Sequence, residues 1–178
     1  MFRTAFSISS FRSLAAALAM LALAACGLEP LYGDKGGVEA SADLATIRID
    51  PIKERVGQLL RNQLLDTLTP MGEPSKPAYR LIVDVTENKL ELAVRKSELA
   101  TRANMQFTAS YRLTRFGSEG AILSRSSTVS TSYNLLNNEF ANLSSEADAR
   151  ERGVRELSQD IARQLSLYLR SQAKAERR

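Results

Sequence analysis

The sequence predicts an α+β fold: a two-layer sandwich in which a mostly antiparallel four-stranded sheet carries two helices on one face, in the order βαβββα. Residues 103–113 alternate strictly between apolar and polar side chains, which is typical of a strand with one buried face. Residues 56–68 and 154–168 instead repeat apolar side chains at spacings of three and four, as amphipathic helices do. The remaining strand-like segments lie between these helices or before them, which gives the predicted order.

The first two elements are bounded by prolines. "LATIRID", residues 44–50, alternates apolar and polar side chains and then meets Pro51, so it predicts a short strand. One apolar helical face follows and continues until Pro70 ends it, formed by Val56, Leu59, Leu60, Leu64 and Leu68. The proline-rich segment 70–77 is expected to be a loop.

The second strand begins near Ala78 and carries an inward apolar row of Tyr79, Leu81, Val83 and Val85. After Glu87 the apolar positions change phase, since Leu90 and Leu92 occupy even positions. This change predicts a bulge or bend near Asn88. A charged connection, 95–102, leads to the alternating third strand.

The third strand is followed by "RFGSEG", which predicts a hairpin connection, and by a fourth strand from about Ala121 to Asn134. Ser144 or Ser145 is expected to cap the last helix. The buried stripe of that helix is predicted to consist of Val154, Leu157, Ile161, Leu165 and Tyr168.

The sheet face opposite the helices is expected to be polar and rich in hydroxyl groups. The residues predicted to face a partner there are Asn104, Gln106, Thr108, Ser110, Arg112, Ser124, Ser126 and Thr128. A long face of this kind with few charges suits packing against another polar surface with water at the contact. An ordinary solvated face is the alternative, and the sequence leaves both open.

The only cysteine follows a leader-like segment. Met1 to Ser13 carry Arg3 and Arg12 without an acid, and an uninterrupted apolar run reaches Ala25. "LAAC", residues 23–26, resembles a bacterial lipobox, so residues 1–25 are expected to be a lipoprotein signal peptide and Cys26 an acylated first residue. A buried core cysteine is the less favoured alternative. In lipoproteins of this type an aspartate directly after the cysteine favours retention in the inner membrane. Gly27 stands there instead, which points to the outer membrane.

The expected organisation is therefore a signal peptide (1–25), a lipidated N-terminus with a glycine-rich spacer (26–41) and an α+β domain (42–178). Acyl chains would attach the protein to the membrane without a transmembrane helix. The signal contains two of the 24 basic residues and none of the 20 acidic ones, so its removal lowers the net charge from +4 to +2. This small charge and the scarcity of aromatic residues argue against a nucleic-acid partner.

Catalytic chemistry is not indicated. The chain has no histidine and one cysteine, which excludes a Ser-His-Asp triad, a Cys-His pair and a His or Cys metal site. Acidic residues such as Glu87, Glu91 and Glu98 could supply a pair of catalytic carboxylates, but their scatter is typical of ordinary surface residues. We expect no enzyme activity, no metal and no cofactor.

Four segments together resemble the LptE family of lipopolysaccharide-assembly lipoproteins in its alphaproteobacterial form: "CGLEPLYG", "GQLLRNQL", "LATRANMQFTASYRL" and "SYNLLNNEFANLSSEADARERGVRELSQDIARQL". The resemblance implies a lipoprotein held in the inner leaflet of the outer membrane and facing the periplasm. It also implies that the protein plugs the β-barrel LptD and helps it insert lipopolysaccharide.

The resemblance further implies that the family binds lipopolysaccharide through basic residues near one end of the sheet. By position, the candidates here are Arg95, Lys96 and Arg102, whose charges suit phosphates. A solvated hairpin tip is the alternative. Two other functions also remain open: a free-standing periplasmic lipid carrier, and a general structural lipoprotein of the outer membrane.

Overall fold

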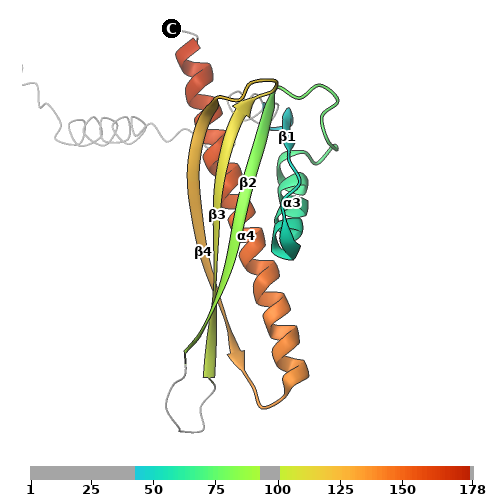
Figure 1. The fold of residues 1–178 in the computed structure, drawn as a ribbon, viewed down its shortest axis with the longest axis vertical. Helices are drawn as coiled ribbons and strands as arrows, with labels where there is room; N and C mark the ends of the chain where they lie inside the picture. The colour runs from blue at the N-terminus through green and yellow to red at the C-terminus, as the bar shows by residue number, and fades with distance from the viewer. Residues whose placement is uncertain (1–42, 93–100, 177–178) are drawn as a thin grey trace, which may run out of the picture.

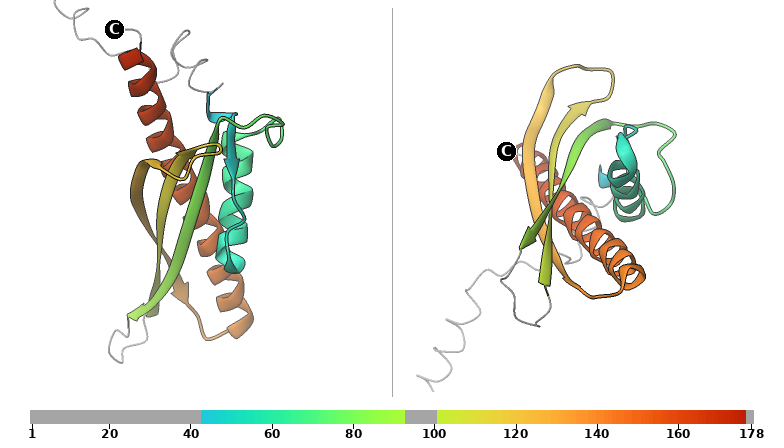
Figure 2. Two further views of the ribbon diagram at one scale, coloured as in Figure 1. Left: turned by 45° about the horizontal axis from the view of Figure 1, so that its top comes forward. Right: turned by 60° about the horizontal axis from the view of Figure 1, so that its bottom comes forward.

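The computed structural model describes residues 43–92 and 101–176. Its sheet has the order β1-β2-β3-β4, formed by β1 (Ile47–Ile49), β2 (Tyr79–Leu92), β3 (Thr101–Arg115) and β4 (Ala121–Leu135). β1 pairs with β2 in parallel, and the other two pairs are antiparallel. The helices α3 (Glu54–Leu68) and α4 (Glu139–Glu176) lie on the same face of the sheet, and α4 crosses it obliquely (Figures 1 and 2). The predicted α+β sandwich is confirmed.

The sheet is long and has two distinct ends. We call the end where β1 and β2 begin and β3 meets β4 the proximal end, and the end where β2 stops and β3 begins the distal end. β1 pairs only with Tyr79–Leu81, so it supports β2 at the proximal end alone. We call the face opposite the helices the open face, because neither of the two described long helices covers it (Figure 2).

The core lies between the sheet and the helices. Every odd-numbered residue of β3 from Ala103 to Leu113 is buried, as the alternation predicts. The two helices contribute their predicted apolar stripes, with Leu60, Leu64, Leu157, Ile161 and Leu165 fully buried. Burying each such side chain stabilises the fold by about 1.5–3 kcal/mol, so this layer holds the helices to the sheet.

Two element boundaries differ from the sequence prediction. β1 covers 47–49 instead of 44–50, because Thr46 donates through both its N–H and its hydroxyl to the Asp43 carbonyl and closes a turn there. α4 begins at Glu139, so Ser144 and Ser145 lie inside the helix and do not cap it. The Asn138 side chain accepts a 3.2 Å hydrogen bond from the Ala141 N–H and so caps the helix one turn earlier.

The predicted bulge near Asn88 is wrong. The β2–β3 register runs without a shift from Tyr79↔Arg115 to Leu92↔Arg102. Glu87 and Lys89 keep the inward phase and meet charged side chains of α4, while Leu90 turns to the open face and is 57% exposed. The irregularity lies elsewhere, between Leu113 and Thr114 in the β3–β4 pairing.

Candidate functional site

The open face of the sheet is a lattice of small polar side chains. Cross-strand partners place Thr86, Thr108 and Thr128 in one row across β2, β3 and β4, and the adjoining rows continue with amides, hydroxyls and the carboxylate of Asp84. The predicted face residues all lie on this side: Asn104, Gln106, Thr108, Ser110, Arg112, Ser124, Ser126 and Thr128. Their role as partner contacts stays a prediction, although their shared face is now a structural fact.

Few of these hydroxyls are used inside the sheet. The Thr108 and Thr128 hydroxyl oxygens lie 3.2 Å apart, and the Ser126 hydroxyl donates to the Ala109 carbonyl at 3.2 Å. Ser110, Ser124 and most of their neighbours on the face are exposed to solvent. The face therefore offers a dense, nearly uncharged set of donors and acceptors to whatever covers it.

The basic candidates lie at or beyond the distal end. Arg102 is exposed on β3 opposite Leu92, at the last pair of the β2–β3 ladder. Arg95 and Lys96 fall outside the described residues, as do Cys26 and the predicted signal and spacer. The structure thus places one of the three proposed lipopolysaccharide contacts and leaves the clustering of all three as a prediction.

An ionic cluster between β2 and α4 was missed by sequence reasoning. The Arg150 guanidinium donates to both oxygens of Glu87, at 2.7–3.1 Å, and to Glu146 at 2.8 Å. Lys89 and the Tyr133 hydroxyl each donate to the other Glu146 oxygen at 3.0 Å. Glu87 and Arg150 are 63 residues apart, so the only available signal was the inward phase of Glu87 and Lys89.

The cluster changes the acidity of its members. Hydrogen bonds from Lys89 and then Arg150 lower the pKa of Glu146 to about 2. The hydrogen bonds to Glu87 are the main reason that the pKa of Arg150 is raised above its usual value. Glu146 and Arg150 are therefore ionised in the folded protein near neutral pH, and their hydrogen bonds hold the start of α4 against the distal half of β2.

A second polar network lies under the middle of α4. Asp160 accepts hydrogen bonds from Ser127, from Arg163 and, at 2.7 Å, from Gln164, whose own oxygen accepts from the Tyr111 hydroxyl at 2.8 Å. Burial raises the pKa of Tyr111 to about 12. Burial alone would raise the pKa of Asp160, but the hydrogen bonds from Ser127 and Gln164 together with the charge of Arg163 outweigh it, and the pKa lies below its usual value. The network fixes the register of α4 on the sheet.

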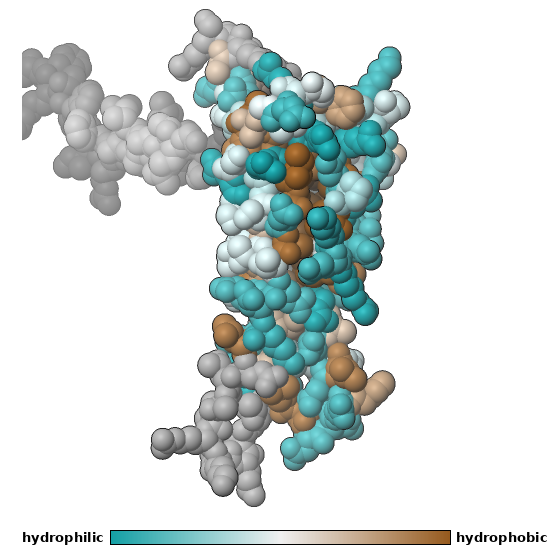
Figure 3. Space-filling view, in the orientation of Figure 1, coloured by the Kyte–Doolittle hydropathy of each residue, from teal (hydrophilic) through white to brown (hydrophobic). Residues whose placement is uncertain are grey.

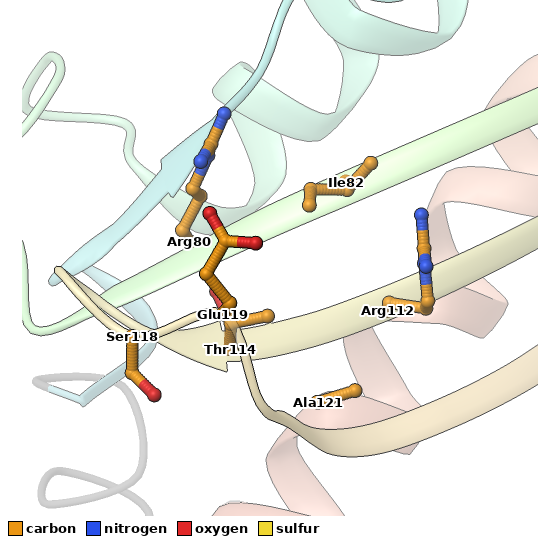
Figure 4. A pocket seen from close by; sticks show the side chains of 7 residues that line it. All are labelled: Arg80, Ile82, Arg112, Thr114, Ser118, Glu119 and Ala121. Carbon is orange, nitrogen blue, oxygen red and sulfur yellow. The ribbon is translucent and has the colours of Figure 1, made fainter.

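A polar pocket of about 160 Å³ opens on the proximal end of the open face (Figure 4). Its wall consists of Arg80, Ile82, Arg112, Thr114, Ser118, Glu119 and Ala121. Arg80 is held by a forked ion pair, because its Nε lies 2.9–3.0 Å from both oxygens of Asp50. That hydrogen bond is the main cause of a raised pKa for Arg80.

The described residues give no sign of other kinds of site. Within them, no group of three or more His, Cys, Asp or Glu side chains could hold a metal ion. Among the helices formed by residues 43–92 and 101–176, none is long and apolar enough to cross a membrane.

Comparisons with solved structures agree with this architecture. A candidate lipoprotein from Caulobacter crescentus is 26% identical, with a TM-score of 0.65, and the match covers 75% of this chain and 97% of that one. A minor lipoprotein from Acinetobacter baumannii is 22% identical, with a TM-score of 0.56, covering 68% of this chain and 90% of its own. Lipoprotein B from Nitrosomonas europaea is 18% identical, with a TM-score of 0.52, and the match covers 69% of this chain and 81% of that one. The last two similarities show the fold alone.

No curated protein matches the sequence. The model of one family does, the one described as "LptE: Lipopolysaccharide-assembly", over residues 44–168. This range contains the whole sheet, α3 and most of α4, and the family comprises lipoproteins of the outer membrane that act in assembly and not in catalysis. The chain therefore belongs to the LptE family of lipopolysaccharide-assembly lipoproteins.

Proposed function

We propose that this lipoprotein, anchored by acyl chains on Cys26, occupies the lumen of an LptD-type β-barrel and assists the insertion of lipopolysaccharide at the outer membrane. Family membership supports the assembly role. The observation that supports the plug role is the open face, a long sheet surface rich in hydroxyl groups that neither α3 nor α4 covers.

The chemistry of this face suits a barrel interior. The lumen of a wide membrane barrel is polar and wet. Hydroxyl and amide groups can bond to such a wall directly or through water, and each contact contributes only modestly. Because most of its side chains are uncharged, covering the face removes few ions from water, and each such removal costs several kcal/mol. A large, weakly charged face can therefore fill a lumen through many small contacts.

A free-standing carrier of lipid tails is less well supported. Such a carrier needs an apolar cavity between sheet and helices. At the centre of this layer, Phe107 is fully buried against α4, where a methyl group on Gly153 would come within 2.3 Å of the Phe107 ring. The pocket described above is polar and lies on the opposite face of the sheet.

Co-purification tests the plug role and separates it from a general structural role. The protein isolated from outer membranes is expected to bring a stoichiometric barrel partner. The double variant Thr108→Glu/Thr128→Glu places two charges on the open face and should lose that partner while still folding. The matched control, Gln58→Glu/Asn62→Glu, adds the same charges to exposed positions of α3 and should keep the partner. Retention of the barrel by both variants would contradict docking through the open face.

The distal end is the proposed site of direct lipopolysaccharide binding. Replacing Arg95, Lys96 and Arg102 together by serine should weaken binding to purified lipopolysaccharide without unfolding the domain, since exposed charges contribute little to stability. The difference should shrink as salt rises, because exposed charges are screened over roughly 8 Å at physiological ionic strength. Equal affinity of wild type and variant at low salt would remove these residues from the site and leave the plug role.

A further inference from the structure

The proximal end of the domain has two turns that each expose a large apolar side chain. Met71 is 99% exposed in the loop after α3, and Phe116 is 47% exposed directly after β3. Each is followed by a glycine with a positive φ, Gly72 at 101° and Gly117 at 80°, which allows the chain to turn there. The Phe116 N–H donates a 2.8 Å hydrogen bond to the Ala78 carbonyl, so the second turn lies against the end of the first loop.

Each turn also contains an exposed cation. Lys76 follows Met71 in the same loop, and Arg115 directly precedes Phe116. Neither cation has an ion-pair partner among the residues that the structure describes, whereas the acid of the first loop, Glu73, pairs with an arginine of α3. Figure 3 shows hydrophobic residues among hydrophilic ones at this end of the molecule, at the top of the view. Apolar side chains at exposed turns with cations beside them are suited to a lipid surface.

The chain that leads to the predicted anchor joins the domain at this same end. The N–H groups of Ala78 and Tyr79 both donate to the Thr46 carbonyl, so the start of the described structure lies beside the loop after α3. Only 17 positions separate Cys26 from Asp43. Acyl chains on Cys26 would therefore give the proximal end a high effective concentration at the membrane.

We propose that the proximal end of the lipoprotein docks on an anionic phospholipid surface, that of the membrane which holds its own acyl chains. Met71 and Phe116 enter the boundary between headgroups and acyl chains. Lys76 and Arg115 lie at the level of the headgroups and attract the lipid phosphates. The inference rests on the proposed acylation and goes beyond the plug role, which assigns no partner to this end. Docked in this way, the sheet points away from the membrane and its open face stays accessible.

The distal end is the rival surface, because it exposes larger apolar side chains. Phe140 is 80% exposed and Leu143 is 62% exposed near the start of α4. This end, however, is remote from the chain that leads to Cys26, since the 14 residues of β2 span roughly 40–45 Å. Docking through one end or the other gives opposite orientations of the sheet, which a reporter at each end distinguishes.

Tryptophan fluorescence provides that reporter, because the chain contains no tryptophan of its own. Phe116→Trp and Phe140→Trp place one indole at the proximal and at the distal end. The acylated protein is reconstituted into vesicles of phosphatidylethanolamine and phosphatidylglycerol with brominated acyl chains, which quench an indole that reaches them. Quenching should be severalfold stronger for Phe116→Trp than for Phe140→Trp. Equal quenching at the two positions, or stronger quenching at Phe140→Trp, would overturn the proposal.

Charge variants in the Phe116→Trp protein test whether the surface is anionic. Each cation near an anionic surface strengthens the attraction about fivefold, so Lys76→Gln/Arg115→Gln should lower the ratio of docked to undocked protein roughly 25-fold. The matched control, Lys53→Gln/Arg55→Gln, removes the same charge from exposed positions at the start of α3 and should dock normally. Unchanged quenching in Lys76→Gln/Arg115→Gln, or equal quenching in brominated phosphatidylcholine vesicles, would exclude an anionic surface and overturn the proposal.

The outcomes separate this inference from the proposed function. A protein that does not enter vesicles carries no acyl chains, which contradicts the anchor and this inference together. A protein that enters vesicles without quenching at Phe116→Trp contradicts this inference alone. Neither result depends on whether a barrel partner co-purifies, because that is measured with the open-face variants.

Discussion

Gly153 provides a direct test of how closely α4 lies on the sheet. A Cβ atom at this position would lie 2.3 Å from Cε2 and 2.6 Å from Cδ2 of Phe107. Ordinary carbon contacts begin near 3.5 Å, so the helix and the ring would have to separate by roughly 1.2 Å in Gly153→Ala. The ring cannot move easily, because Phe107 is fully buried at the centre of β3.

Two opposing effects determine how much Gly153→Ala changes the free energy of unfolding. Alanine favours a helix interior over glycine by up to about 1 kcal/mol. Overpacking a well-filled core costs about 1–3 kcal/mol and sometimes more, and a separation above 1 Å belongs at the upper end. The expected net loss is about 2 kcal/mol, which for a chain of this length lowers the melting temperature by roughly 4–8 °C.

Chemical and thermal unfolding of the full chain, followed by circular dichroism, measures this loss. Gly120→Ala is the matched control, because the nearest atom to a Cβ there is 3.8 Å away, and its stability should change by less than about 0.5 kcal/mol. Phe107→Leu replaces the ring by a smaller side chain. In that background Gly153→Ala should therefore reduce the free energy of unfolding by less than it does in the wild type. A Gly153→Ala protein as stable as wild type would refute the close approach of α4 to the sheet.

Three further predictions concern the anchor, the core and the ionic cluster. Cys26→Ala removes the acyl-accepting thiol and should abolish fatty-acid labelling; normal labelling would contradict the lipoprotein assignment. Leu157→Asp places an unpaired charge in the fully buried layer and should reduce the free energy of unfolding by several kcal/mol in urea titrations, and wild-type behaviour would mean that α4 does not dock there. Because the pKa of Glu146 is lowered to about 2, its contribution to stability is complete above its unfolded pKa of roughly 4.3 and is lost as pH falls toward 2. Wild type should therefore lose more stability than Glu146→Gln between about pH 6 and pH 3, and parallel losses would mean that the carboxylate is not held by its partners.

The sequence predicted the fold well because the buried faces of its elements are local patterns. The alternation in 103–113 and the apolar stripe around Leu157 and Ile161 identify the buried residues from one segment alone, without knowledge of the segment that packs against it. The predicted bulge near Asn88 was wrong because it assumed that only apolar side chains face the helices. A charged side chain can also face them when a partner of opposite charge lies there. Glu87 keeps the inward phase of β2, and Arg150 meets it there.

The helix cap and the pocket show the same limit. Ser144 and Ser145 are good capping residues, but Asn138 lies one turn earlier and its amide reaches the Ala141 N–H. The pocket depends on the β3–β4 register, which brings Thr114 beside Ala121 and leaves its hydroxyl without a partner. Such pairings across the sheet have no counterpart in the periodicity of a single strand.

The two faces of the sheet use polar groups in opposite ways. On the helix side, charges such as Arg150 and Asp160 are matched within the chain, so their ionisation fixes α4 in one register. On the open face, most polar groups are uncharged and exposed, and the charges on β3 stand near its ends, as Arg102 and Arg112 do. Covering hydroxyls costs little once they find partners, whereas covering an unmatched ion costs several kcal/mol. A sheet face made mainly of hydroxyls and amides can therefore be covered by a polar partner at a lower cost in free energy than a face made of charged side chains.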